Sequence, residues 1–322
     1  MSRPLTIALT FDLDPDVFDE SISPTEARTK ISWRGVSEGI PMIRERLAAL
    51  GADCGVEPKP SWFVRVDNQI EAIWGRPGYL LEAYADLFRT IEAAGEEIAW
   101  HPHLYRRTDA GWAQETDPAA LTKAMERALE DMRALGYAPR TGRIGEAYGA
   151  DALMAAFDQL GVAYDSTAMA GRKRVDAERT IDWEETPHRA YRPSCADHRI
   201  PGAPSRNVIE LPMSMLKVRA DYDSEPFLRY LDLSFHPRAV QPGLEALIAS
   251  ADYLITVTHP SAFLAGLAPP GGHGLVAFDI AALEANFRAI LDAAARCGRP
   301  VRFSTISALG DECAALMGEV RP

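Results

Sequence analysis

Four short motifs carry the residues of this 322-residue chain that are best suited to chemistry. In chain order they are Thr10-Phe11-Asp12-Leu13-Asp14, Trp100-His101-Pro102-His103, Arg143-Ile144-Gly145 and Val257-Thr258-His259-Pro260. Together they supply two carboxylates, two imidazoles, a guanidinium and a late histidine. A mononuclear metal hydrolase uses this set of groups. Each motif alone is weak evidence, so the prediction rests on their combination and order.

Asp12 and Asp14 stand two residues apart at the end of the first predicted strand, so their side chains should leave the same face. Two carboxylates this close repel each other unless a cation neutralises them or one of them takes a proton. We therefore expect Asp14 to bind a divalent metal and Asp12 to stay free as a general base. The alternative is a pair of acids that cap a turn or a helix.

His101 and His103 are also two residues apart, and Pro102 disfavours a helical conformation for His101. In an extended segment both rings could face one point. Imidazole suits zinc and other borderline divalent ions, and two His with one Asp leave positions for water. The pattern predicts His101, His103 and Asp14 as metal ligands. The alternative is a pair of buried, hydrogen-bonded histidines.

Arg143 follows a Thr-Gly turn, and His259 follows an apolar strand. A guanidinium beside Asp12 would fix the rotamer of that carboxylate and lower its pKa. A histidine in the position of His259 could protonate a leaving amine. The alternatives are a surface arginine and a structural histidine at a strand end.

Apolar strand-like runs alternate with helical patterns along the chain. The predicted strands are 5–11, 61–66, 97–100, 162–164, 208–211, 253–258 and 301–304, and the predicted helices are 37–50, 79–94, 117–136, 151–160 and 279–297. Such alternation indicates βα units around a parallel sheet. About seven units favour an α/β barrel with its active site at the C-terminal ends of the strands. We expect all four motifs to meet at that edge.

Residues 167–207 break this alternation, so we expect a single domain, 1–322, with an irregular insertion there. Trp183 in this segment could stack on a sugar ring, and the run Arg172-Lys173-Arg174 could bind a diphosphate or form only a solvated loop. For His188, His198, His236 and His273 we expect structural roles. There is no G-x-S-x-G motif for a serine nucleophile and no glycine-rich nucleotide-binding motif.

The composition fits a cytoplasmic protein. The formal charge is −12, which argues against nucleic acid or an anionic membrane as the main partner. The four cysteines are scattered, which favours reduced thiols. The first residues lack a signal-peptide pattern, and no run approaches the ~18 apolar residues of a membrane span.

With these motifs the chain resembles the polysaccharide deacetylase family, whose members remove N- or O-acetyl groups from sugars. The resemblance runs over nearly the whole length. It includes Thr10–Asp14, the run 92–101 that leads into the histidines, 143–149, 160–166, His259-Pro260 and 303–307. It departs from the family where Leu13 separates the two acids, where the histidines are two rather than four residues apart, and where the third motif is reduced to Arg143-Ile144-Gly145-Glu146.

The resemblance implies a distorted (β/α) barrel and a metal-dependent carbohydrate deacetylase. In this role Asp14, His101 and His103 would hold one divalent ion, with zinc the first choice and cobalt, nickel or iron acceptable. Asp12 would be the base, oriented by Arg143, and His259 the acid. Glu146, Tyr148 and Trp183 are the expected substrate contacts, and a backbone N–H between Gly145 and Tyr148 could stabilise the oxyanion. The expected substrate is a small molecule or a glycan precursor, such as a soluble sugar, a nucleotide-sugar or a lipid-linked sugar. Hydrolysis of a formamide or cyclic imide, and an inactive glycan-binding barrel, are the alternatives.

Overall fold

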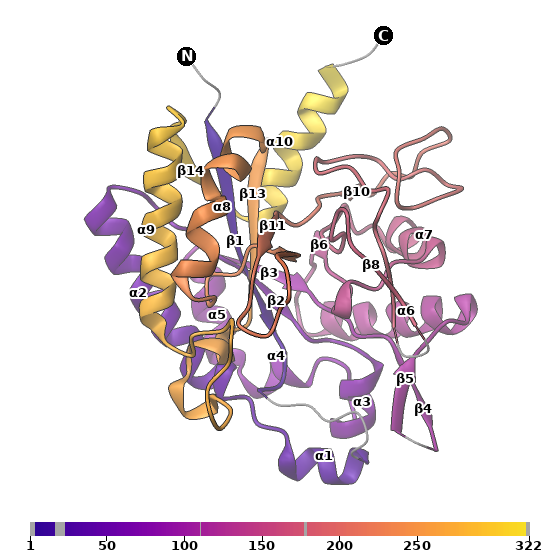
Figure 1. Cartoon of the computed structure of the whole chain (residues 1–322). Helices are drawn as coiled ribbons and strands as arrows, with labels where there is room; N and C mark the ends of the chain where they lie inside the picture. Colours follow the sequence, from indigo (N-terminus) through magenta and orange to yellow (C-terminus); the bar gives the residue numbers. More distant parts are fainter. Residues whose placement is uncertain (1–3, 17–22, 110, 177–178, 320–322) are drawn as a thin grey trace.

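The computed structural model describes residues 4–16, 23–109, 111–176 and 179–319. In this part of the chain eight strands form one parallel sheet, shown in Figure 1. Its continuous order is β10 (Ile209–Glu210), β7 (Tyr164–Asp165), β6 (Thr141–Gly142), β3 (Glu97–Trp100), β2 (Ser61–Val64), β1 (Leu5–Leu13) and β13 (Tyr253–Thr258). The eighth strand, β14 (Val301–Phe303), pairs with the first residues of β1. The predicted α/β barrel of about seven parallel strands is confirmed.

Helices surround the sheet on both sides, with α2, α8 and α9 on one side of Figure 1 and α6 and α7 on the other. The α-helices are α1 (Pro24–Lys30), α2 (Ile40–Cys54), α3 (Asn68–Trp74), α4 (Tyr79–Ala83), α5 (Ala85–Ala93), α6 (Pro118–Ala134), α7 (Asp151–Leu160), α8 (Pro237–Ser250), α9 (Ile280–Arg296) and α10 (Ile306–Glu319). Helix α6 begins where the sequence predicts it, because Asp117 caps the N–H of Ala120 and Pro118 occupies the first turn. A π-helical segment, η1 (Gly35–Gly39), and three short 3-10 segments, η2 (Gly145–Ala147), η3 (Pro260–Phe263) and η4 (Ala265–Leu267), complete the helical elements.

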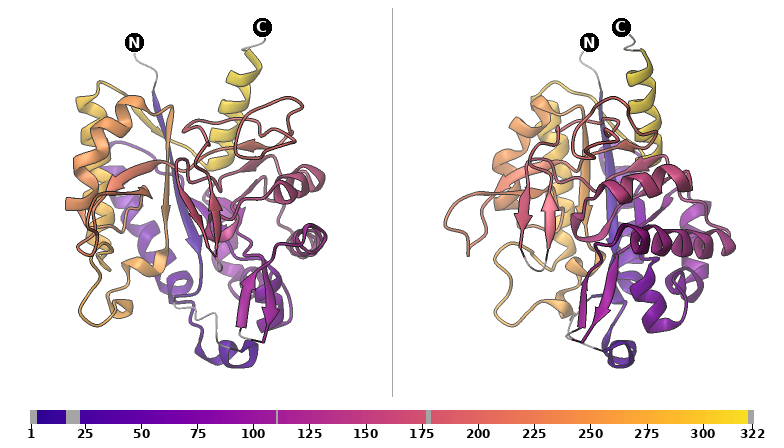
Figure 2. Two further views of the ribbon diagram at one scale, coloured as in Figure 1. Left: turned by 45° about the vertical axis from the view of Figure 1, so that its right-hand side comes forward. Right: turned by 90° about the vertical axis from the view of Figure 1, so that its right-hand side faces the viewer.

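Three antiparallel hairpins extend from the barrel, as the two views of Figure 2 show. They are β4 (Tyr105–Thr108) with β5 (Gly111–Gln114), β8 (Lys173–Val175) with β9 (Thr180–Asp182), and β11 (Met215–Val218) with β12 (Phe227–Tyr230). The start of β1 and the end of α10 lie at the same end of the molecule in both figures, and the arrow of β1 points away from them. The C-terminal ends of the strands therefore face the opposite end.

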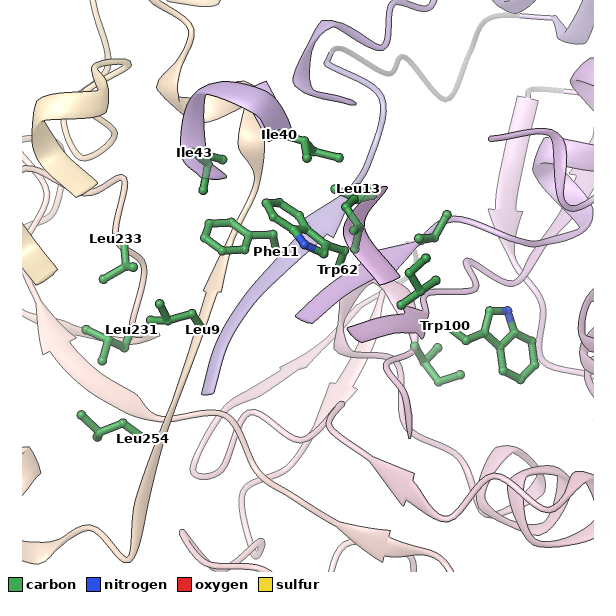
Figure 3. Packing of buried hydrophobic residues seen from close by; sticks show 14 of the residues in the cluster. Leu9, Phe11, Leu13, Ile40, Ile43, Trp62, Trp100, Leu231, Leu233 and Leu254 are labelled. Atoms are coloured by element: carbon green, nitrogen blue, oxygen red, sulfur yellow. The ribbon is translucent and has the colours of Figure 1, made fainter. Parts of the chain in front are cut away.

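The two faces of the strands bury different sets of side chains. On β1, Leu9, Phe11 and Leu13 point to the helices, where Phe11 stacks on Trp62 at a ring-centroid distance of 4.7 Å (Figure 3). The alternate residue Ala8 joins a second cluster inside the barrel, with Phe63, Ala99, Ile255 and others. Because side chains alternate along a strand, the inner row of each strand continues directly to the barrel mouth.

The barrel closes between β10 and β13 through a non-strand segment rather than through a direct strand pair. Ser214 donates its N–H to the carbonyl of Ile255 at 3.1 Å and accepts the N–H of Ile255 on its hydroxyl at 2.9 Å. The N–H of Val257 donates to the carbonyl of Leu231 at 2.9 Å. These bonds satisfy the backbone at the outer edge of β13 and explain why the barrel is distorted.

Three local predictions differ from the structure. The predicted helix 79–94 is divided at Tyr84, whose φ of −117° and ψ of 31° are not helical. Thr141 and Gly142, expected to form a turn, are strand β6. The segment 167–207, expected to be irregular, holds the hairpin β8–β9 and is tied to the sheet by the bridge between Tyr191 and Glu210. None of the helices in the described residues is long and apolar enough to cross a membrane.

Candidate metal centre

The inner rows of four strands deliver polar side chains to one point at the barrel mouth. Asp12 continues the inner row of β1, and Arg65 stands two residues after the inward-facing Phe63 of β2. His101 stands two residues after Ala99, and His259 two residues after Val257. Strand periodicity thus makes these residues neighbours, although they are far apart in the sequence.

Asp14, His101 and His103 form a cluster with the geometry of a metal site. Their nearest ligand atoms all lie within 4.8 Å of one another. The two Nε2 atoms are 3.2 Å apart, and those of His103 and His101 lie 3.2 Å and 3.5 Å from the oxygens of Asp14. The two rings therefore face one point, as the sequence predicts.

The protonation of both rings suits a cation. Nδ1 of His101 lies 2.8 Å from the carbonyl of Arg143, which can only accept, so this nitrogen carries a proton and Nε2 is the atom that faces the cluster as a possible ligand. Burial, and next the charge of Arg65, lower the pKa of His103, which favours its neutral form. With the proton of His103 on its Nδ1, the three residues would present three acceptor atoms to one point, an arrangement that fits a divalent ion.

The backbone after β6 is shaped around the His103 ring. A Cβ on Gly145 would lie 2.0 Å from Cδ2 of His103, so only glycine leaves room for the ring. The next two residues, Glu146 and Ala147, have φ values of 58° and 53°, in the left-handed region that non-glycine residues rarely adopt. Such strain clusters at functional sites.

Asp12 is held by Arg143, as the sequence predicts. Nη1 of Arg143 donates to Oδ1 of Asp12 at 2.6 Å and to the Thr10 hydroxyl at 2.9 Å. The guanidinium is buried, lies 4.0 Å above the ring of Phe63, and donates from Nε to the carbonyl of Ser166. The other oxygen of Asp12, Oδ2, lies 3.9 Å from Nε2 of His101 and so faces the three candidate metal ligands.

His259 approaches the cluster from the end of β13, the strand that pairs with β1. Its Nε2 lies 3.1 Å from Oδ2 of Asp14. Burial acts to lower the pKa of His259, but the hydrogen bond and charge of Asp14 outweigh it and raise the pKa to about 9. The imidazolium is therefore the main form at neutral pH and has a proton to donate.

Arg65 is a site residue that the sequence analysis missed. Its buried guanidinium donates to Oδ1 of Asp14 at 2.8 Å, to Asp67 at 2.6 Å and to Gln69 at 2.8 Å. A carboxylate offers about four lone pairs, so Asp14 can accept from Arg65 and still bind an ion. The signal was present: Arg65 follows the inward-facing Phe63 by two residues.

Two chambers meet at the cluster. One, of about 410 Å³, is lined by Asp12, Asp14, His101, His103, Arg143, Ile144, Glu146, Ala147, Met169, Ile181, Met213, Tyr230, Val257 and His259. The other, of about 320 Å³, is lined by Asp14, Pro15, Asp16, Arg65, Gln69, His103, Tyr105, Glu146, His259 and Ser261. Tyr230 is a further residue that the sequence analysis missed. Burial, and then the charges of Asp232 and Asp12, raise its pKa, so its hydroxyl stays a donor.

Of the three residues expected to contact substrate, two are buried away from the chambers and one lines both of them. Trp183 is fully buried and donates from Nε1 to the carbonyl of Ala147 at 2.8 Å. Its ring has no exposed face in this structure, which leaves no room for the predicted stacking on a sugar. Tyr148 is also buried and is not among the residues that line either chamber, so its expected contact with substrate stays a prediction. Glu146 does lie at the junction of the two chambers, paired with Arg179 at 2.9 Å.

The expected oxyanion donors are partly occupied. The N–H of Gly145 donates to the carbonyl of Pro102 at 2.9 Å, and the N–H of Tyr148 donates to the carbonyl of Gly145 at 3.2 Å. Neither is directed at the chamber. Tyr230, which carries a neutral hydroxyl donor, is among the residues that line it.

The basic run in the insertion has structural partners. Arg172 lies over Phe227 and donates to the carbonyl of Leu228, while Lys173 pairs with Glu184 and Arg174 with Asp176. These contacts favour a structural role over a diphosphate site. Likewise His198 binds Asp151, and His273 accepts backbone N–H groups of Leu275 and Val276, in line with the structural roles expected for them.

No family model matches the sequence, and no curated protein matches it. Among solved structures, a protein from Mycobacterium smegmatis described as a polysaccharide deacetylase matches with a TM-score of 0.55 at 17% identity, over 98% of this chain and 92% of its own. The chain has the polysaccharide deacetylase fold. A second structure, from Parabacteroides distasonis and described as a glycoside hydrolase/deacetylase, matches with a TM-score of 0.57 at 13% identity, over 96% of this chain and 70% of its own. At these identities the likeness concerns the fold, and it bears out the resemblance seen in the sequence at that level.

Proposed function

We propose that the protein is a metal-dependent hydrolase that removes an N-acyl group from a sugar or a sugar-containing precursor. One observation carries the proposal: Asp12, Asp14, His101, His103 and His259 converge on one chamber at the mouth of a deacetylase-fold barrel. A divalent ion held by Asp14, His101 and His103 would lower the pKa of a bound water and polarise the acyl carbonyl. The Asp-His-His set suits zinc first, and cobalt, nickel or iron also.

Asp12 and His259 divide the proton transfers between them. Arg143 occupies Oδ1 of Asp12, which leaves Oδ2 to take the proton of the attacking water. His259 carries a proton at neutral pH and gives it to the departing amine nitrogen. Tyr230 lines the same chamber, and its hydroxyl would donate to the carbonyl oxygen as its charge develops.

The smaller chamber, of about 320 Å³, has a mainly polar wall and is called the polar chamber below. Its lining supports a sugar as the amine part of the substrate. Its wall combines Asp16, Gln69, Tyr105 and Ser261, whose groups match a ligand rich in hydroxyls. This chamber borders His259, so the amine nitrogen of a sugar bound there would lie beside the proton donor.

The proposal is tested with the Asp12→Asn variant. Release of amine from N-acylated amino sugars should fall by ~10²–10⁴-fold, the usual contribution of a general base, while the metal content stays that of the native protein. Asp53→Asn, a surface acid paired with Arg288, is the matched control and should keep the native rate. A native rate in Asp12→Asn would remove Asp12 from the mechanism, and no hydrolysis of any acylated amino sugar by the metal-loaded native protein would overturn the proposal.

A further inference from the structure

The two chambers at the candidate metal centre differ sharply in chemistry, and this difference bears on which acyl group is removed. We infer that the larger chamber, of about 410 Å³ and called the apolar chamber below, binds an acyl group larger than acetyl. The group would be a linear chain of about six carbons or a group of similar apolar bulk. This inference rests on the proposed hydrolysis of an N-acyl amine and adds the substrate class to it.

The wall of the larger chamber is apolar except where the candidate metal ligands and their polar neighbours lie. Its polar groups, other than Tyr230 and Glu146, are the candidate ligands and the acid–base residues, which gather at one end. The remainder is lined by Ile144, Ala147, Met169, Ile181, Met213 and Val257. Apart from the half-buried Ile181, these side chains belong to the buried core, so the wall of the chamber is continuous with the apolar interior.

The size of the chamber exceeds what an acetyl group needs. The chamber measures about 410 Å³. A methyl group fills a space on the order of one water molecule, ~30 Å³. Even with an ion, a water and the carbonyl group at its polar end, the apolar part can hold several more methylene groups. An apolar wall left against water is unfavourable, and a longer acyl chain would cover it.

The chamber wall is held in place from behind. Trp183 packs with Ala147, Met169, Met213 and Val257 in one buried cluster. Its indole N–H donates to the carbonyl of Ala147 at 2.8 Å. The wall is therefore formed before any ligand arrives, which favours binding because little has to be ordered. The role of the buried Trp183 is then to support the chamber wall from behind.

The positions of the base and the acid decide which half of the substrate enters which chamber. Asp12 and Arg143 line only the apolar chamber, whereas His259 lines both chambers. The attacking water lies beside Asp12, so the acyl carbon and its chain occupy the apolar side. The amine nitrogen lies beside His259 and continues into the polar chamber with Gln69 and Tyr105. Water adds its oxygen to the acyl carbon, the C–N bond breaks, and the nitrogen leaves as an amine with the donated proton.

Binding measurements on the Asp12→Asn variant, which should hydrolyse the substrate slowly, separate the affinity for the acyl group from the rate of catalysis. Titration calorimetry of Asp12→Asn, in the metal state in which it is purified, compares N-hexanoylglucosamine with N-acetylglucosamine. Each buried methylene strengthens binding by about fourfold, so the hexanoyl compound should bind at least ~10-fold more tightly. The native protein should also show a higher kcat/KM for the hexanoyl compound, measured by amine release.

The outcomes distinguish this inference from the proposed function. Equal or weaker binding of the hexanoyl compound overturns the inference, and hydrolysis of the acetyl compound would then still uphold the proposed function. Tighter hexanoyl binding with no hydrolysis of either compound supports the chamber assignment and overturns the proposed reaction. If neither compound binds or reacts, both are overturned.

A matched pair of isoleucine variants locates the effect. Ile181→Trp places a larger side chain in the chamber wall and should lower the hexanoyl-to-acetyl binding ratio by ~10-fold or more. Ile200→Trp changes a residue that is 37% exposed and lines neither chamber, and it should keep the native ratio. An unchanged ratio in Ile181→Trp, with native thermal stability, would place the acyl group elsewhere.

Discussion

Replacing Gly145 with alanine should displace a predicted metal ligand without touching the ligand itself. The added Cβ would stand 2.0 Å from Cδ2 and 2.2 Å from Nε2 of His103. Carbon atoms in contact prefer ~3.5–4.0 Å, so the ring has to retreat by roughly 1.5 Å. Metal–ligand distances tolerate only about ±0.2 Å, so His103 would no longer reach an ion shared with Asp14 and His101.

The expected cost has two parts that can be measured separately. Overpacking should lower the free energy of unfolding by ~1–3 kcal/mol, measured by urea denaturation of the metal-free protein. Metal affinity, measured by competition with a chromophoric chelator, should fall by at least ~100-fold, as much as in His103→Ala. Gly145 lies outside the left-handed region, so backbone strain does not contribute.

Gly149→Ala is the matched control for this experiment. Its Cβ would meet Cζ2 of Trp183 at 2.5 Å, so it is similarly crowded, but it meets none of the predicted ligands. It should lose comparable stability and keep its metal. Native metal affinity in Gly145→Ala would refute the reasoning, because it would mean that the position of the His103 ring does not matter for the ion.

Three further predictions concern the surroundings of the site and the scaffold. Arg65→Met should lower the free energy of unfolding by ~3–5 kcal/mol in urea denaturation, because it leaves the buried Asp67 carboxylate without its cation, and adding Asp67→Asn should recover part of the loss. Trp183→Phe should cost ~1 kcal/mol of stability for the lost hydrogen bond with no change in sugar affinity by calorimetry, and a tenfold weaker sugar affinity would restore the stacking role. Burial acts to raise the pKa of Asp131, but hydrogen bonds from Arg76 and a backbone N–H outweigh it and hold the pKa below its usual value. Asp131→Asn should therefore be less stable than the native protein at pH 7 by ~2 kcal/mol in thermal and urea unfolding. The difference should shrink as the pH falls from about 4 through the lower pKa of the folded state, and a difference independent of pH would contradict this.

Strand periodicity explains why much of the candidate site could be predicted from sequence. Asp12, His101 and His259 each extend an apolar strand, and the C-terminal ends of parallel strands meet at one mouth. The same rule would have found Arg65, because it continues the inner row of β2 after Phe63. Their roles in catalysis and metal binding remain predictions.

Other features depend on contacts that one sequence does not show. Strand β6 has two residues, too few for a periodic pattern. Trp183 lies in an aperiodic segment, where nothing in the sequence distinguishes a buried ring from an exposed one. The contact between Gly145 and His103 joins residues 42 positions apart and exists only once β3 and β6 pair at Trp100 and Gly142.

Metal content tests the central claim most directly. Elemental mass spectrometry of the protein purified without chelators should find close to one zinc-like ion per chain. His103→Ala should lose this ion, whereas His273→Ala, which changes an exposed loop histidine, should keep it. Absence of metal in the native protein, even after incubation with excess zinc or cobalt, would contradict the account and leave a barrel that binds without hydrolysis.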